Sequence, residues 1–192
     1  QVDLLGEYAS HIVGLFPVLA FANIRVVLDC ANGAMSDVAP EAFARLGATV
    51  IVLNDRPNGK NINEGCGATH PEVVSEAVRL HKADLGLAFD GDGDRVIAVD
   101  HIGDVVDGDH LIALAAIDLH KRGKLKSNSV AVTVMTNAGF HQAMTKAGIN
   151  VITTPVGDRN ILVAFDEHGV VLGGEQSGHI IYRDYATTGD GL

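Results

Sequence analysis

Three aspartates, Asp90, Asp92 and Asp94, alternate with glycines in one short segment of the sequence, and Arg95 follows them directly. Unpaired carboxylates this close repel one another, at a cost on the order of 1 kcal/mol each. A hard divalent cation relieves the repulsion because it prefers oxygen ligands, and the intervening glycines let the backbone fold tightly around it. The guanidinium of Arg95 is suited to a phosphate oxygen. The segment therefore predicts a metal site beside a phosphate.

Three other kinds of site also contain closely spaced aspartates, and the residues of this segment fit them to different degrees. An EF-hand loop beginning at Asp90 needs Gly at its sixth position and Glu at its twelfth, where the sequence has Arg95 and His101. A phosphatase with an aspartate nucleophile also places D-x-D after an apolar strand, so Asp90 as a nucleophile stays open. Such a site does not need Asp94. A solvated acidic turn, or a calcium-binding or scaffold module, is the non-enzymatic alternative.

Two further loops carry groups that could bind a phosphosugar. Residues 173–179 read Gly-Gly-Glu-Gln-Ser-Gly-His, and the carboxylate of Glu175 with the hydroxyl of Ser177 suits neighbouring sugar hydroxyls. The imidazole of His179 can transfer a proton near neutral pH. Residues 154–159 read Thr-Pro-Val-Gly-Asp-Arg, which can seat a phosphate at a helix N-terminus. Ordinary helix capping by Asp158 is the alternative there.

Alternating strands and helices must position these loops. Apolar runs predict strands over 26–28, 50–53, 85–89, 96–99, 130–134, 151–153 and 170–172. Helical spacing and stop signals predict helices over 2–22, 38–46, 71–82, a segment ending near 147, and 158–169.

The same order of elements occurs twice, which indicates an internal duplication. We therefore expect an α/β fold of two similar three-layer α/β/α domains with mixed, mostly parallel sheets. The predicted domains are 1–104, with the metal-binding loop, and 105–192, with the sugar-binding loop. In such folds ligands bind beyond the C-terminal ends of the strands, where the polar loops lie.

The amino-acid composition limits the classes of molecule that this chain could bind. The 192 residues include 14 Lys and Arg against 24 Asp and Glu, a formal net charge of −10, and residues 84–109 hold much of this acidity. Such a chain is unsuited to nucleic acid or to anionic membrane surfaces. No apolar run reaches the ~18 residues of a membrane span, and no leader pattern is present. Two cysteines, Cys30 and Cys66, are expected to be free thiols in a reducing compartment, so the cytoplasm is the expected location.

Together the loops DGDGDR, TPVGDR and GEQSGH resemble those of the α-D-phosphohexomutase superfamily, and the resemblance covers essentially the whole chain. It implies that Asp90, Asp92 and Asp94 bind Mg²⁺ and that Arg95 is a catalytic neighbour of the reactive phosphate. It also implies phosphoryl transfer from a phosphoserine to a phosphosugar, through a bisphosphorylated intermediate that reorients and returns the other phosphate.

The resemblance assigns the remaining site residues to substrate. Glu175 and Ser177 would hold sugar hydroxyls, with Gly178 beside them. His179 would serve as an acid/base or a phosphate contact, and Arg159 would bind substrate.

Within the superfamily, Gln176 and the segment 185–191 most resemble the bacterial branch that interconverts glucosamine 6-phosphate and glucosamine 1-phosphate for amino-sugar and cell-wall precursors. Branches acting on mannose or glucose phosphates are the alternative.

The departure from the superfamily is also informative. Its members have four domains, with a nucleophilic serine in a T-A-S-H-N-P-like loop of the first and a phosphate-gripping R-x-S-G-T-E-P-like loop in the last; this sequence contains neither. Ser10 follows an alanine and precedes a histidine, but Ile12 and Val13 then replace Asn-Pro. The sequence also begins without Met. We therefore expect the second domain and a shortened third, inactive without the first and fourth.

Overall fold

The computed structural model describes residues 4–192 and divides them into two compact units. One unit ends at Val105 and also includes Leu192, and the other spans Val106–Gly191. The domain limits 1–104 and 105–192 stay a sequence-based prediction.

The first unit is built on a five-stranded sheet with the order β2-β1-β3-β4-β5. The strands are β1 (Arg25–Asp29), β2 (Thr49–Leu53), β3 (Leu85–Phe89), β4 (Val96–Val99) and β5 (Val105–Val106), whose second residue already belongs to the other unit. The central strand β1 runs parallel to β2 and β3, whereas β4 is antiparallel to β3. The polar segments after β1 and β3 therefore leave the sheet at the same edge.

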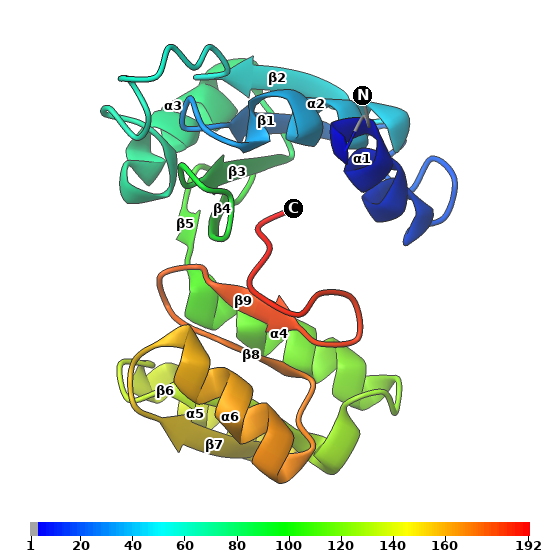
Figure 1. Ribbon diagram of the computed structural model, residues 1–192, viewed down its shortest axis with the longest axis vertical. Coiled ribbons are helices and arrows are strands. Elements are labelled where there is room, and N and C mark those ends of the chain that lie inside the picture. The colour runs from blue at the N-terminus through cyan, green and yellow to red at the C-terminus, as the bar shows by residue number, and fades with distance from the viewer. Residues whose placement is uncertain (1–3) are drawn as a thin grey trace. The chain divides into compact units, whose positions relative to one another are not determined.

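Helices cover both faces of this sheet (Figure 1). Alternate residues of a strand point to opposite faces. Val26 and Leu28 accordingly pack in the cluster that includes residues of α1 (Leu4–Gly14) and α2 (Met35–Arg45). Val27 packs in the cluster of α3 (Pro71–His81), which follows the short 3₁₀ helix η1 (Gly67–Thr69). Pro71 begins α3, a position where its missing N–H costs nothing.

The second unit repeats this plan with a four-stranded sheet in the order β7-β6-β8-β9. Its elements are α4 (Gly108–Lys121), η2 (Lys126–Asn128), β6 (Ser129–Thr133), α5 (Ala138–Ala147), β7 (Asn150–Thr154), α6 (Asp158–His168), β8 (Leu172–Gly174) and β9 (Ile180–Tyr182). Strand β6 is parallel to β7 and β8, and β9 is antiparallel to β8.

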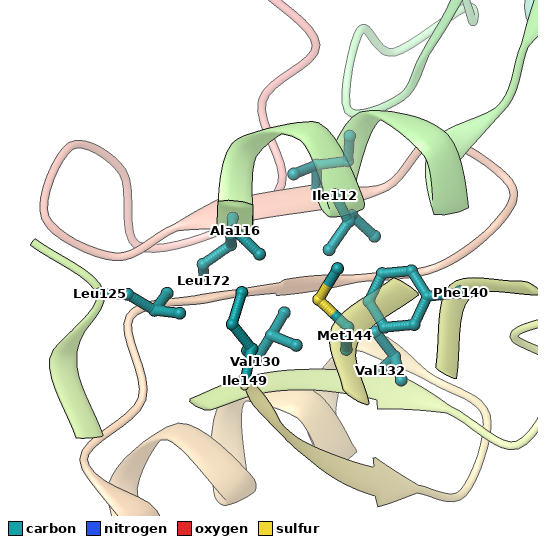
Figure 2. Packing of buried hydrophobic residues seen from close by; sticks show 10 residues of the cluster. Ile112, Ala116, Leu125, Val130, Val132, Phe140, Met144, Ile149 and Leu172 are labelled. Atoms are coloured by element: carbon teal, nitrogen blue, oxygen red, sulfur yellow. The ribbon is translucent and has the colours of Figure 1, made fainter. Parts of the chain in front are cut away.

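The core of the second unit lies on both faces of its sheet. Figure 2 shows the cluster that joins Ile112 and Ala116 of α4 to Phe140 and Met144 of α5 above Val130 and Val132 of β6. The intervening Ala131 packs instead with α6. The expected pair of similar α/β/α layers with mixed sheets is confirmed in both units.

The structure differs from the predicted helices at two places: one helix is shorter than predicted, and one was not predicted at all. The helix expected over 2–22 ends at Gly14 in the structure, and Val2 lies outside the described residues. Pro17 cannot continue a helix, and Leu19 and Asn23 adopt positive φ of 57° and 68°. Helix α4 was not predicted, because the aspartates before it suggested an acidic connection between the two domains.

Among residues 4–192, none of the helices combines the length and apolar character that a bilayer crossing requires.

Candidate functional site

The three aspartates predicted as metal ligands lie together beyond the C-terminal end of β3. One carboxylate oxygen of each of Asp90, Asp92 and Asp94 lies within 4.8 Å of those of the other two. Asp90 is buried, Asp92 is exposed and Asp94 is intermediate, so the group opens outward from the sheet. Gly93 turns the loop with φ of 78°, a conformation that glycine adopts at little cost.

Backbone hydrogen bonds fix Asp90 within this loop. Its Oδ1 accepts from the amides of Gly93 and Arg95, each at 3.1 Å. The Asp90 amide in turn donates to the carbonyl of Arg95 at 3.3 Å, and the Gly93 amide also donates to the carbonyl of Asp90 at 3.2 Å. The inner carboxylate is therefore held in place before any ion arrives, which lowers the entropy cost of binding one.

The electrostatics of the loop favour an added positive charge. Burial raises the pKa of the Asp90 carboxyl. A hydrogen bond that its protonated form donates to Asp94, and the negative charges of Asp94 and Asp92, raise it further. Arg95 Nε stands 3.6 Å from Asp90 Oδ2 and 3.7 Å from Asp94 Oδ1, but the Arg95 side chain is 46% exposed. One half-solvated guanidinium does not balance three carboxylates. Oxygen donors with excess negative charge fit Mg²⁺ or Ca²⁺.

The second predicted loop lies in the other unit, after β8. Its main chain closes into a tight turn, in which the Gly178 amide donates to the Glu175 carbonyl at 3.0 Å and the Glu175 amide to the His179 carbonyl at 2.9 Å. Ser177 is exposed at the tip of this turn. Glu175 Oε1 accepts from the Gly157 amide at 3.0 Å. This bond joins the loop to the TPVGDR segment, as expected for strands β7 and β8 ending at one edge.

His179 lies at the foot of the turn rather than at its tip. It is only 5% exposed and directly precedes β9. A Cβ on Gly189 would lie 2.3–2.6 Å from atoms of the imidazole ring, so the segment around Gly189 lies against that ring. For His179 to contact substrate as predicted, the segment around Gly189 has to move away from the ring or contact the substrate as well.

The TPVGDR segment differs from one of the two sequence-based interpretations of its helix start, the capping by Asp158, and the phosphate seat stays a prediction. Gly157 is the N-cap of α6, with no side-chain cap, and Asp158 is the first helical residue. Asp158 Oδ1 accepts from the amide of Arg159 at 2.7 Å. Capping of the helix by Asp158 was therefore wrong, and Arg159 is exposed at the helix start.

Ser10 has a structural explanation. It lies within α1, where its hydroxyl donates to the Gly6 carbonyl at 2.7 Å and accepts from Arg45 Nη1 at 3.2 Å. Both contacts are ordinary for a serine on a helix, and that Ser10 is not the nucleophile stays a sequence-based prediction.

Sequence reasoning missed the residues that support the second loop from α4. Asp107 caps α4 by accepting from the His110 amide at 3.1 Å, and its Oδ2 accepts from Gln176 Nε2 at the same distance. The Gly108 amide donates to the Gln176 carbonyl at 3.0 Å. Buried Asp109, in the same helix, instead holds the start of α5, because it accepts from both the amide and Nδ2 of Asn137 at 2.8 Å. An Asp before an apolar helical run is a capping signal that could have revealed α4.

Comparison with known families decides the affiliation. A family model described as phosphoglucomutase/phosphomannomutase, alpha/beta/alpha domain II, matches residues 6–103, and the model for domain III of that family matches residues 107–192. The chain belongs to the phosphoglucomutase/phosphomannomutase family. Its two units correspond to the second and third domains, as the resemblance of the three loops implied.

Curated members of this family resemble the chain from end to end. The protein named phosphoglucosamine mutase of Desulforudis audaxviator is 51% identical over 190 residues, which cover 99% of this chain and 42% of that protein. The phosphoglucosamine mutase of Frankia casuarinae is 52% identical over 189 residues, or 98% and 41%. The chain thus spans about 42% of the length of the curated relatives it matches.

Solved structures of the family share the fold. A phosphoglucomutase/phosphomannomutase family protein from Burkholderia thailandensis superposes with a TM-score of 0.87 at 26% identity, over 100% of this chain and 42% of that one. The N-acetylphosphoglucosamine mutase of Aspergillus fumigatus, solved with GlcNAc-6P and magnesium, gives 0.64 at 22% identity, over 92% and 36%. The latter supports the fold alone.

Proposed function

We propose that this chain forms the magnesium-binding and sugar-recognition domains of a phosphoglucosamine mutase, an enzyme that interconverts glucosamine 6-phosphate and glucosamine 1-phosphate. The observation that carries the proposal is the identity of about 50% over the whole chain to proteins named phosphoglucosamine mutase. Because the chain spans about 42% of those relatives, the phosphoserine and the second phosphate-gripping loop would come from the first and fourth domains.

The first unit would supply the metal and one phosphate contact. Asp90, Asp92 and Asp94 fit Mg²⁺ because their carboxylate oxygens already converge within 4.8 Å. Mg²⁺, when bound, would disperse the negative charge of the transferring phosphoryl group. Arg95 would bind a phosphate oxygen, since its guanidinium is half exposed beside the carboxylates. Asp90 would be held rigidly by the amides of Gly93 and Arg95.

The second unit would recognise the sugar phosphate. Ser177 is exposed to donate to or accept from a sugar hydroxyl, and one carboxylate oxygen of Glu175 is held by the Gly157 amide, which leaves the other for substrate. Gly178 would let the sugar approach the backbone. Arg159 would meet the substrate phosphate, and His179 would contact a phosphate or move a proton.

The setting of the enzyme is part of the same proposal. The family acts on charged phosphosugars, so we place the protein in the cytoplasm, without nucleic-acid or membrane partners. The two buried cysteines, Cys30 and Cys66, are free thiols in the structure, which suits a reducing compartment.

Turnover measurements test the proposal. The full-length enzyme that carries this segment should convert glucosamine 6-phosphate with Mg²⁺ and a bisphosphate activator, with a higher kcat/KM than for glucose or mannose 6-phosphate. The 192-residue chain alone should show none. Asp92→Asn should abolish turnover, whereas Ser10→Ala should leave it unchanged. Preference for mannose or glucose phosphate would overturn the sugar assignment, and activity of the isolated chain would overturn the need for an external serine.

A further inference from the structure

Asp29, the last residue of β1, is fully buried outside the acidic loop. Its two carboxylate oxygens hold two different segments. Oδ1 accepts from the Ala31 amide at 2.9 Å, in the turn after β1, and Oδ2 accepts from the Gly67 amide at 2.9 Å, at the start of η1. One side chain therefore joins the turn after β1 to the start of η1, two backbone segments that are far apart in the sequence.

Both of these segments contact the backbone of the acidic loop or of β3, the strand that leads into it. Just after the turn that follows β1, the Ala34 amide donates to the Gly91 carbonyl at 2.8 Å. In the second, a Cβ on Gly67 would stand 2.5 Å from the Phe89 carbonyl oxygen and 2.6 Å from the Ala31 side chain. The two segments thus lie against residues 89 and 91, on either side of Asp90.

The chain between the turn after β1 and the start of η1 also contacts the acidic loop. The Asn63 amide donates to the Ala31 carbonyl at 2.9 Å. A Cβ on Gly91 would lie 2.6 Å from the Ile62 side chain and 2.7 Å from Asn63 Nδ2. The Ile62 and Asn63 side chains therefore pack against position 91, so movement of residues 62–63 would disturb the acidic loop.

We propose that Asp29 is a positioning residue for the metal-binding loop and sets the spacing of Asp90, Asp92 and Asp94 without touching the ion. The inference rests on the proposed function, in which these aspartates bind Mg²⁺. A carboxylate offers acceptors on both oxygens, whereas the amide of an Asn offers one acceptor and one donor. In Asp29→Asn the donor would face the N–H of either Ala31 or Gly67, and that segment would be released.

A matched pair of variants of the 192-residue chain tests this. Asp84→Asn makes the same change at the other end of the same sheet, where Asp84 Oδ2 accepts from the Arg25 amide at 2.8 Å at the start of β1. Two quantities are measured: the Mg²⁺ dissociation constant by calorimetry, and the amide NMR resonances of Gly91 and Gly93 without metal. Asp29→Asn should weaken Mg²⁺ binding by about tenfold or more, the usual effect of losing a partner that orients a metal ligand, and should shift both resonances.

Asp84→Asn should leave both quantities close to those of the unmodified chain. Equal Mg²⁺ affinity and unshifted resonances in Asp29→Asn would overturn the inference, and so would an equal loss in both variants. If the unmodified chain binds no Mg²⁺, the metal assignment of the proposed function fails, and the metal-free resonances alone decide whether Asp29 positions the loop.

A second variant covers the case in which Asp29→Asn does not fold. Ile62 is 51% exposed and contacts the region of Gly91, so Ile62→Ala should fold and still loosen the support. We expect a weakening of Mg²⁺ binding of about threefold, smaller than the range for a residue that orients a ligand directly. Unchanged affinity and unchanged Gly91 and Gly93 resonances in Ile62→Ala would count against this route of support.

Discussion

Gly33 lies so close to Gly91 that a Cβ on Gly33 would stand 2.2 Å from the Gly91 carbonyl oxygen. The same carbonyl accepts a hydrogen bond from the Ala34 amide at 2.8 Å. The turn after the central strand and the acidic loop are therefore in direct backbone contact, and the position of one depends on that of the other.

Gly33→Ala should consequently damage both stability and metal binding. The added methyl group meets backbone rather than a flexible side chain, so we expect a loss of about 1–3 kcal/mol in the free energy of unfolding, as for overpacking in a core. Urea denaturation measures this loss, and calorimetry measures the weaker Mg²⁺ binding. Gly14→Ala is the control, because its Cβ would meet nothing within 4 Å. Equal behaviour of the two variants would contradict the packing argument.

Asp90→Asn should separate stability from metal binding. The pKa of the Asp90 carboxyl is raised in the folded chain, chiefly by burial. A raised folded pKa contributes stability below the unfolded pKa of about 3.9, and this stability is lost as pH rises through the folded pKa. At pH 7 the charged Asp90 therefore opposes folding of the metal-free chain.

The neutral Asn should thus abolish Mg²⁺ binding and raise the melting temperature in chelator at pH 7, by about 2 °C for a chain of this size. The gain should shrink as pH falls and vanish well below the unfolded pKa of about 3.9, where Asp90 is protonated in both states. Asp92→Asn, at an exposed position, should lose Mg²⁺ without the same gain. A lower melting temperature for Asp90→Asn at pH 7 would show that its ion pair with Arg95 outweighs its burial.

Cys30 should make the chain sensitive to alkaline pH. Burial, with a smaller contribution from the Asp29 charge, raises the pKa of its thiol from 9.0 to about 12. The unfolded chain can ionise this thiol between these values and the folded chain cannot, so stability falls as pH rises from 9.0 towards 12. Cys30→Ser does not titrate there, and its denaturation free energy should decline less steeply. Parallel declines would contradict the assignment. The native thiol should also react slowly with iodoacetamide at pH 8.

Gly108→Ala should affect the second loop alone. A Cβ on Gly108 would lie 2.1 Å from the Glu175 carbonyl oxygen and 2.8 Å from that of Gln176. In the full-length enzyme we expect KM for glucosamine 6-phosphate to rise by about tenfold, an effect of about 1.4 kcal/mol. Mg²⁺ affinity serves as the internal control and should stay unchanged, because the metal loop belongs to the other unit. A matching loss of Mg²⁺ affinity would indicate general unfolding instead.

The sequence was a good guide wherever local chemistry and local structure coincide. The apolar run Leu85–Phe89 ends directly at Asp90, so both the strand and the clustering of the three aspartates could be predicted. Helix α4 was missed because its cap, Asp107, is one of several aspartates that together suggested an acidic connection. The role of Asp29 could not be predicted, because its bond to the Gly67 amide joins residues 38 positions apart. Contacts of this kind are set by tertiary packing and leave no periodic pattern.

The shared strand order of the two sheets, β2-β1-β3-β4 and β7-β6-β8-β9, places the acidic loop after β3 and the GEQSGH loop after β8 at equivalent positions of two copies. If the loops act as proposed, an ancestral repeat could have kept one copy for phosphoryl-transfer chemistry and released the other to change its ligand. Residues of the GEQSGH loop could then change while the cation-binding copy stayed constant.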